Sequence, residues 1–463
     1  MSPRSFAARP ARRRPSRLLA RSLHLGVLVA GALVGQKAAA SGLATARFGG
    51  EHGHPTADNP TAIYYNPAGI ALKPGTRIFI DGSIAFRWAS YARPDSAINS
   101  LTGTPEGARD ANAGEARLFN VIAAPFAGVS SDFGTKFFSA GAAVYFPFGG
   151  QARWKPNDKY AHVMGNDLAQ KYPGAVDGVQ RWYAIDGSLR SMYITGAVAF
   201  NIAKIGLSIG LSGSAIRSEV DTIRARNADG TDDLVLSSGM LKEGRSWLKA
   251  SGWQGGFGIG FVWQWRDKLW IGGSYTSRPN VTGDMTLKGT LQNAFTTSVV
   301  DAPTPIELTQ RYPDIIRLGF RFRPISKLEL RLFGDFTNWK VLDKQCVLIA
   351  TAEGRRCDFP GADTALTNPE EFGGDKPDDQ VVGVTQHLPR FWKPAGGVRI
   401  GASYWVVDPV ELFAGLGFDS NAVPVQTLDP ALMDSHKMSF SLGGRFRLHE
   451  RLHLGLTLTD IHY

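Results

Sequence analysis

The stretch "KLELRLFGDF", residues 327–336, carries an apolar or small residue at every second position. Successive side chains of a β-strand point to opposite faces, so this period of two predicts a strand with one apolar and one polar face. The stretch "LHLGLTLT", residues 452–459, has the same period. Both stretches therefore predict strands that separate an apolar environment from a polar one.

Thirteen stretches of this kind follow residue 75, and none of them has the length or apolarity of a transmembrane helix. Hydrophobic residues make up 43% and charged residues 20% of the 463 residues, which excludes a disordered chain and a helical membrane protein. The stretches are 76–90, 116–129, 136–153, 188–202, 204–220, 251–265, 268–282, 306–323, 326–341, 385–406, 409–419, 436–448 and 451–463.

The connections between these stretches alternate in length. Short turns such as "SDFGTK", "NIAK" and "LHER" are separated by long polar connections. Short turns on one side and long loops on the other are typical of an outer-membrane β-barrel, and a bilayer can be spanned only by helices or closed barrels. The long connections are 91–115, 154–187, 221–250, 283–305, 342–384 and 420–435.

Residues 1–40 have the pattern of a secretory signal peptide. Seven arginines precede the apolar run 23–34, and three alanines at 38–40 form a small-residue cleavage site. The run is too short to span a bilayer, which disfavours a membrane-anchoring helix. Without this segment the chain has 43 basic and 41 acidic residues, a net charge of +2, so its charge predicts no nucleic-acid partner.

Cys346 and Cys357 lie in one polar stretch of a chain expected to be exported. A disulfide between them is the expected state, and closing so short a loop stabilises by roughly 3 kcal/mol in the chain-entropy model. Two free thiols are the alternative. A metal site is disfavoured, because no histidine lies near them in the sequence.

Tryptophans lie near the ends of several stretches, as in the aromatic girdles of membrane barrels, although strand propensity explains part of this pattern. They are Trp263, Trp265, Trp270, Trp339, Trp392 and Trp405.

Three motifs resemble catalytic or ligand-binding patterns. "GLSIG", residues 206–210, matches a nucleophile elbow but lies inside an alternating stretch, and "GFGIG", residues 256–260, lacks the spacing of a dinucleotide loop. In "EHGHP", His52 and His54 alternate along the chain, but no third metal ligand is identifiable. We therefore expect no catalytic residue, no metal and no cofactor, and a protein that is not an enzyme.

Four stretches resemble, in their order and spacing, the FadL family of outer-membrane transporters for long-chain fatty acids and other hydrophobic molecules. They are "SGLATARFGGEHGHPTADNPTAIYYNPAGIAL" at 41–72, "VYFPFGGQARW" at 144–154, the stretch from "PDIIRLGF" to "TNWKVLD" at 313–343, and the stretch from "GGVRIGASYW" to "LGLTLTD" at 396–460.

The resemblance implies an all-β fold, a fourteen-stranded transmembrane antiparallel barrel in the bacterial outer membrane with an N-terminal hatch inside its lumen. It divides the chain into a signal peptide (1–40), a hatch (41–75) and a barrel (76–463). The hatch motif that it implies comprises Asp58, Asn66, Pro67, Ala68 and Gly69.

The resemblance also implies passive uptake of hydrophobic molecules, which leave through a lateral gap at a kink in the third strand. Its partners would be the hydrophobic ligand, outer-membrane lipid and lipopolysaccharide, and the barrel-assembly machinery, and the protein would be a monomer. The kink would comprise Pro147, Phe148, Gly149 and Gly150, since proline removes a ladder donor and glycine permits a bulge. A plain strand end at the membrane rim is the alternative for these residues. A barrel enzyme acting on lipids and a structural or adhesive barrel are the alternative functions.

The strand count leaves one point open, because single-chain bacterial barrels have an even number of strands. We expect a fourteenth strand that is missing after residue 463. The alternative is an additional strand within 283–305 or 342–384. The leucines of 452–458 define the apolar face of the last stretch, and Tyr463 lies on the opposite face.

Overall fold

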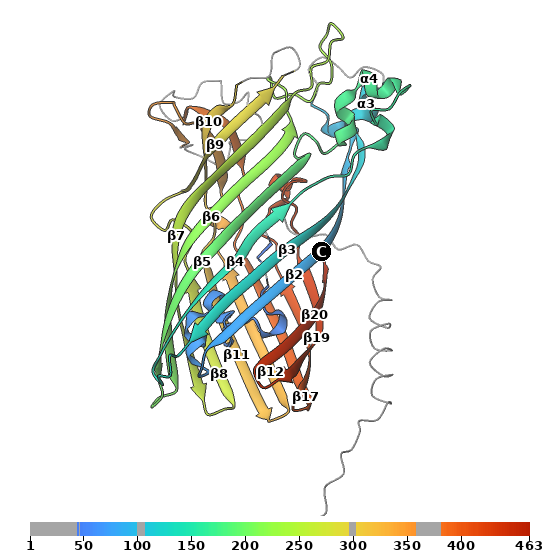
Figure 1. Cartoon of the computed structure of the whole chain (residues 1–463). Helices are drawn as coiled ribbons and strands as arrows, with labels where there is room; N and C mark the ends of the chain where they lie inside the picture. Colours follow the sequence, from blue (N-terminus) through green and yellow to red (C-terminus); the bar gives the residue numbers. More distant parts are fainter. Residues whose placement is uncertain (1–43, 46, 100–106, 296–301, 358–380) are drawn as a thin grey trace, which may run out of the picture. The chain divides into compact units, whose positions relative to one another are not determined.

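The computed structural model shows an almost entirely antiparallel β architecture, in agreement with the predicted fold class (Figure 1). Its strands form one eighteen-stranded sheet and a small sheet of β14 (Arg356–Cys357) and β15 (Val381–Val382). Among the residues described, no helix is both long and apolar enough to cross a membrane. The expected signal peptide lies outside the described residues, which are 44–45, 47–99, 107–295, 302–357 and 381–463.

The strands of the large sheet form the wall of the barrel, and each passage of the chain from one end of the wall to the other is called a wall crossing. Nine wall crossings are single strands. They are β2 (Arg77–Arg93), β3 (Gly114–Ser131), β4 (Phe138–Gln151), β5 (Asp186–Ile202), β6 (Leu207–Ala225), β7 (Arg245–Trp265), β18 (Val410–Asp419), β19 (Lys437–His449) and β20 (Leu452–His462).

Four further crossings each consist of two consecutive strands. For example, the two halves of β7 pair with β8 and with β9, so β8 and β9 continue one another across the wall. These crossings are β8 (Leu269–Thr276) with β9 (Met285–Ala294), β10 (Thr304–Gln310) with β11 (Ile315–Ile325), β12 (Leu328–Thr337) with β13 (Lys344–Ile349), and β16 (Val384–Pro389) with β17 (Ala395–Val407).

The described residues therefore form thirteen wall crossings, the number predicted from the sequence. Strand residues occur inside the long connections 283–305 and 342–384, but they lengthen neighbouring crossings and add none among the described residues. Among the described residues, β2 pairs within the wall only with β3, and β20 pairs only with β19. The fourteenth strand stays a prediction.

Helices are short and occupy the N-terminal segment and the long connections. They are η1 (Gly50–His52), α2 (Ala62–Tyr65), η2 (Pro67–Ala71), η3 (Asp95–Ala97), α3 (Ala108–Asn112), η4 (Asp158–Tyr160), α4 (Asp167–Lys171), η5 (Pro173–Asp177), η6 (Trp339–Val341) and η8 (Val425–Thr427).

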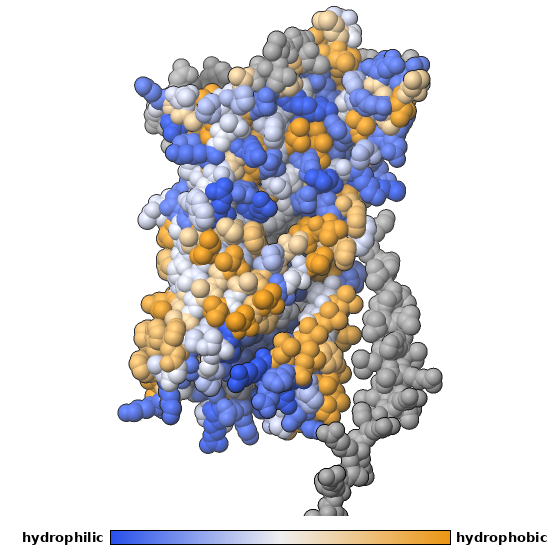
Figure 2. Space-filling view, in the orientation of Figure 1, coloured by the Kyte–Doolittle hydropathy of each residue, from blue (hydrophilic) through white to orange (hydrophobic). Residues whose placement is uncertain are grey.

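Apolar side chains cover the outward face of the wall strands. On β20, Leu452, Leu454, Leu456 and Leu458 are 56–73% exposed, whereas Thr457 of the opposite phase lies against Gly50. Figure 2 shows apolar side chains over the lower strands of the visible face, with hydrophilic residues at the turns and over the upper loops. This band is the surface that a bilayer would cover.

The predicted tryptophan girdle is only partly correct. Trp263 and Trp265 are exposed on β7, as expected for residues facing lipid headgroups. Trp270, Trp339 and Trp392 are about 5–6% exposed and belong to the interior. The position of a tryptophan near a strand end does not show which face of the wall its ring occupies. Successive side chains of a strand point to opposite faces, so a shift of one residue moves the ring to the other face.

Residues 47–76, which we call the hatch segment, lie against the inward faces of wall strands. η2 contacts β5, β6 and β7, and η1 contacts β18, a strand far from these along the wall. The segment therefore lies between distant parts of the wall, and Figure 1 shows it in blue among the lower strands.

Glycines on the inward face let the hatch segment approach the wall closely. A Cβ atom at Gly210 of β6 would overlap the main chain of Ala68, and one at Gly260 of β7 would overlap the side chain of Asn66. The glycine-rich strands are therefore part of the seat of the hatch segment.

Substituting Gly210 by valine should lower the stability of the barrel by about 1–3 kcal/mol, because the added side chain overpacks the seat of η2. The measurement is the urea midpoint of the detergent-solubilised protein. The matched control is Gly213→Val on the same strand, where a Cβ atom would meet nothing within 4 Å. Equal midpoints for the two variants would contradict the close approach.

Candidate functional site

Asn66 links the hatch segment to the wall. Its Nδ2 donates to the main-chain oxygens of Pro55 and Phe261, each at 2.8 Å, and its Oδ1 accepts from the main-chain N of Ala68 at 3.2 Å. The last bond caps η2, whose first residue is Pro67. The predicted hatch motif thus contains a capped 3-10 helix.

Ala68 and Gly69 allow this helix to pack without a gap. Ala68 is buried with Val262 and Trp270 of the wall. A Cβ atom on Gly69 would overlap the main-chain oxygen of Ala57. The predicted hatch motif is thus a packing and capping unit in which each residue type has a steric or hydrogen-bonding reason.

Asp58 is the charged link between the hatch segment and β11. Its carboxylate lies 2.8 Å from Arg321 Nη1 and 3.1 Å from Lys73 Nζ. Arg321 lies over the Trp270 ring, with its Cζ 4.1 Å from the ring centroid. Burial alone would raise the pKa of Asp58, but the two cations outweigh it and hold that pKa well below its usual range.

His52 and His54 bind different partners. His52 Nε2 lies 2.8 Å from Glu411 Oε1 on β18, whereas His54 Nδ1 accepts a hydrogen bond from the main-chain N of Thr56 at 3.3 Å. Within the described ranges, neither belongs to a group of three or more metal-ligating side chains. Both histidines therefore serve to position the hatch segment.

The wall is interrupted between β3 and β4. These strands pair only from Phe126–Tyr145 to Ser131–Ala140. Beyond this point β3 pairs with β2 alone among the described strands, apart from one bridge between Leu118 and Trp154. We call the unpaired edge of β3, residues 119–125, and the facing part of β4 the wall gap.

Two prolines border the wall gap. Pro125 directly precedes Phe126, the first residue of β3 that pairs with β4, and Pro147 lies in a bulge of β4, where the register with β5 shifts between Tyr145 and Phe148. A proline has no N–H to donate to a ladder. The sequence analysis found Pro147 but missed Pro125, whose place opposite the kink depends on strand register.

The predicted kink residues beyond the bulge change partner. Gly149 and Phe148 pair with β1 (Ala44–Thr45), in addition to β5. The main chain that precedes the hatch segment thus lies along the edge of β4 that β3 has left. It satisfies part of the ladder that the gap would otherwise leave open.

A column of buried aromatic rings extends along the interior beside the wall gap. Ring centroids lie 5.6 Å apart for Phe126 and Tyr145, 5.6 Å for Tyr145 and Tyr193, and 5.9 Å for Phe148 and Trp339. The column offers aromatic surface suited to the apolar body of an aliphatic or aromatic ligand, and the buried cation Arg317 lies next to it, 4.5 Å from the ring centroid of the adjoining Tyr64.

A cavity of about 1250 Å³ opens among the long connections and reaches the β4 edge of the wall gap at Gly150 and Gln151. Its depth is apolar. The side chains that line it there are Leu189, Val220, Leu248, Leu308, Val347 and Leu432.

Arginines give the same cavity a positive charge. Arg93 is paired with Asp232 and Arg390 with Asp429. Arg224 and Arg226 also line the cavity, but they take part in no ion pair among the described residues. Arg224 donates to Gln386 Oε1 at 3.1 Å and Arg226 to the main-chain oxygen of Thr385 at 3.3 Å.

The sequence analysis missed these two arginines. They alternate in "TIRARN" at the end of β6, where Arg224 lies in the strand and Arg226 directly follows its last residue, Ala225. Their lack of carboxylate partners is a tertiary property that the pattern does not contain.

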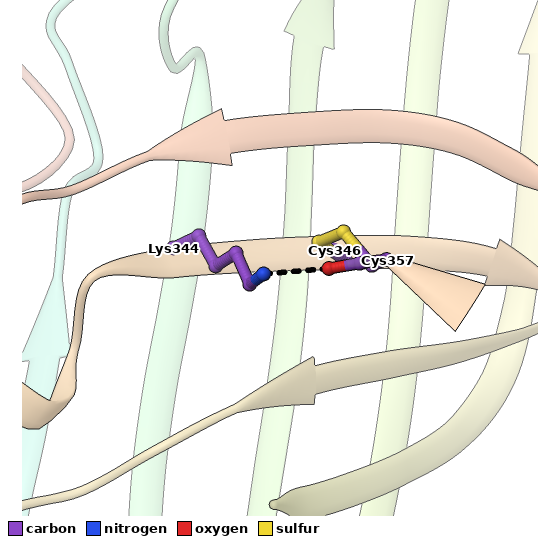
Figure 3. Close-up of a disulfide and its surroundings, with 3 residues drawn as sticks. All are labelled: Lys344, Cys346 and Cys357. Atoms are coloured by element: carbon purple, nitrogen blue, oxygen red, sulfur yellow. Dashed lines mark hydrogen bonds between the residues drawn. A yellow bond between two sulfur atoms is a disulfide. The ribbon is translucent and has the colours of Figure 1, made fainter. Parts of the chain in front are cut away.

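The structure joins Cys346 and Cys357 in a disulfide with a Cα–Cα distance of 6.4 Å (Figure 3). Lys344 Nζ donates to the main-chain oxygen of Cys357 at 2.6 Å. His387 lies opposite Cys346 in the β13–β16 ladder and within 4.8 Å of both sulfurs. The expectation that no histidine lies near was therefore wrong in space, although the cysteines are bonded to each other.

The two motifs that resemble catalytic patterns lie in wall strands. "GLSIG" begins at the turn before β6 and continues into it, and Ser208 is buried without a histidine partner among the residues described. "GFGIG" lies within β7. Neither has the strand-to-helix turn that its chemistry requires.

Comparisons with known proteins agree with the family predicted from the sequence. A family model described as outer membrane protein transport protein (OMPP1/FadL/TodX) matches residues 25–462. A curated outer membrane protein of Neisseria meningitidis serogroup B is 22% identical over 410 residues, which cover 88% of this chain and 81% of the relative.

Solved structures share the fold. A FadL homologue of Pseudomonas aeruginosa has a TM-score of 0.61 at 15% identity, with 92% of this chain and 90% of the homologue covered. The toluene transporter TodX of Pseudomonas putida has a TM-score of 0.56 at 16% identity, with 92% and 93% covered.

Replacing Asp58 by asparagine should lower stability by about 3 kcal/mol, because Arg321 is left charged and buried without its partner. Because the pKa of Asp58 is lower in the folded protein, its contribution to the free energy of unfolding is fully present at pH values above the unfolded pKa of about 3.9. This contribution is lost only as the pH falls below that value. Urea midpoints in detergent between pH 3 and pH 8 measure both effects.

The control for this prediction is Asp110→Asn, which removes an ion pair of Lys159 whose two side chains are exposed. An exposed pair contributes little, so this variant should match the wild type. A wild-type midpoint for Asp58→Asn at pH 7 would contradict the assigned role of the link.

Proposed function

We propose, since this chain belongs to the family of outer membrane transport proteins (OMPP1/FadL/TodX) and resides in the outer membrane, that it takes up hydrophobic molecules passively. The substrate class that fits best is an amphipathic acid with a long apolar body, such as a long-chain fatty acid. The ligand enters from the long connections and leaves sideways through the wall gap.

The cavity with its two unpaired arginines carries this proposal. A cavity of about 1250 Å³ with apolar side chains in its lining accommodates a hydrocarbon chain, and Arg224 and Arg226 of the same lining offer charge-assisted hydrogen bonds to a carboxylate. A neutral hydrocarbon would leave both guanidinium groups without an anionic partner. The cavity therefore favours an acid over the toluene named for TodX.

The lateral exit is supported by the wall gap. The cavity reaches Gly150 and Gln151 on one edge of the gap, and the opposite edge is the unpaired part of β3. The hatch segment fills the lower lumen through links such as Asn66 with Phe261, so a path straight along the barrel axis is obstructed. A ligand in the cavity would then meet the gap first.

The double variant Arg224→Met, Arg226→Met should weaken oleate binding at least tenfold, because each lost charge-assisted hydrogen bond contributes about 1.5–3 kcal/mol. Toluene binding should not change. The measurements are the affinity of the purified protein in detergent and uptake of both labelled compounds by cells with and without the protein.

The control for this experiment is Arg153→Met, whose side chain is exposed beside Asp186. Equal oleate uptake by cells with and without the wild-type protein would refute transport of fatty acids. Loss of toluene and oleate binding together would show that the arginines shape the cavity without selecting a head group.

Closing the wall gap should abolish uptake without unfolding the barrel. Deleting Pro147 removes the extra residue of the bulge, and Pro125→Val restores a ladder donor, so β3 and β4 can continue their pairing. We expect oleate uptake to fall at least fivefold while oleate affinity stays within about threefold, since Arg224, Arg226 and the apolar side chains of the cavity are unchanged.

Pro324→Val is the control, because Pro324 lies beside a register shift of β11 far along the chain from the gap. Folding is read from the heat-modifiable migration of the barrel in gels. Unchanged uptake by a folded closed-gap variant would rule out the lateral route.

A further inference from the structure

Arg87 is a buried cation on the inward face of β2. It is 1% exposed and pairs in the ladder with Asn120 of β3, a residue in the stretch that β4 has left. It is thus the charged side chain placed behind the β3 edge of the wall gap.

The guanidinium of Arg87 is only partly satisfied. Nη1 donates to the main-chain oxygen of Gln151 at 3.3 Å, whereas Nε and Nη2 have no hydrogen-bond partner among the described residues. None of the ion pairs in the described part of the chain includes Arg87. Among the described residues, the charge that acts on Arg87 belongs to Tyr463.

Within the folded chain, only Nη1 of the Arg87 guanidinium has a hydrogen-bond acceptor among the described residues. The main-chain oxygen of Gln151 also accepts from Asn120 Nδ2, so this oxygen is satisfied without the arginine. A buried charge with two open donors is costly, and an apolar side chain of similar size would be more stable at such a place. Arg87 therefore has donors that the folded chain does not use.

Gln151 connects Arg87 to the cavity. Gln151 lines the cavity and is the residue to which Arg87 donates. Trp154, which bridges to Leu118 at the far end of the gap, has a second buried donor without a partner, its Nε1. Both side chains with open donors thus lie beside the wall gap, and Gln151 joins Arg87 to the lining of the cavity.

We propose that Arg87 forms an anion subsite at the wall gap, which receives the carboxylate of an amphipathic ligand after it leaves Arg224 and Arg226. This inference rests on the proposed function. The subsite lets the head group pass the apolar wall with its charge paired, while the hydrocarbon body moves along the aromatic column. The ligand is a monocarboxylate with a long apolar tail.

The test compares two ligands that differ in charge alone, labelled oleate and labelled oleyl alcohol, in cells that produce Arg87→Met. Oleate uptake should fall about tenfold, and oleyl alcohol uptake should remain at the wild-type rate. Oleate affinity of the purified variant should stay within about twofold, because the cavity arginines are unchanged. The thermal midpoint of the barrel should not fall, since an uncompensated buried charge has been removed.

Two further variants keep the test decisive if Arg87→Met does not fold. Arg87→Lys retains the charge and should keep most of the oleate uptake, whereas Arg87→Gln removes the charge and should lose it. Arg117→Met on β3, whose side chain is 73% exposed, is the matched control and should behave as wild type.

Two outcomes overturn the subsite. If oleate and oleyl alcohol uptake fall equally in folded variants, Arg87 supports the gap structurally; if neither falls, the head group does not pass it. Failure of the proposed function gives a different result, because wild-type cells would then show no oleate uptake above cells without the protein.

Discussion

A strand in a bilayer must have its main-chain N–H and C=O groups paired, because hydrocarbon offers no hydrogen-bond partner. The wall meets this requirement with antiparallel ladders and breaks it between β3 and β4. The edges of the break are partly repaired: β1 pairs with Phe148 and Gly149, and Asn120 donates to the oxygen of Gln151. The β4 side of the opening is therefore bordered in part by paired main chain, whereas residues 119–125 of β3 keep an unpaired edge.

The hatch segment is positioned by the inward faces of the same wall strands. A glycine wall lacks side chains to fill a lumen, so the short helices fill it instead and approach the strands closely at Gly210 and Gly260. Polar side chains of the wall then orient the segment, because Arg321 of β11 pairs with Asp58 and Glu411 of β18 is hydrogen-bonded to His52. Alternating strands point their polar side chains into the barrel, and these inward side chains hold the hatch segment in place.

The period of two was enough to predict the thirteen crossings, because one face of each strand meets lipid. The family resemblance, together with the missing N–H of proline, predicted a kink at Pro147, where the register of β4 with β5 shifts. The sequence could not show Pro125 beside it, or the approach of His387 to Cys346, because both depend on register between strands. The sequence also could not show that Arg224 has no carboxylate partner among the described residues, because its neighbours in space come from distant parts of the chain.

Charge placement follows from what an amphipathic acid needs on its way through an apolar wall. The aromatic column around Tyr145 can hold a hydrocarbon tail but not a carboxylate, whose burial without a partner is costly. Cations are therefore useful where the head group stops, and open donors occur at Arg226, which lines the cavity, and at Arg87 beside the gap. Arg317 lies beside the column itself, but its guanidinium donates to Tyr64 and Thr276 of the folded chain.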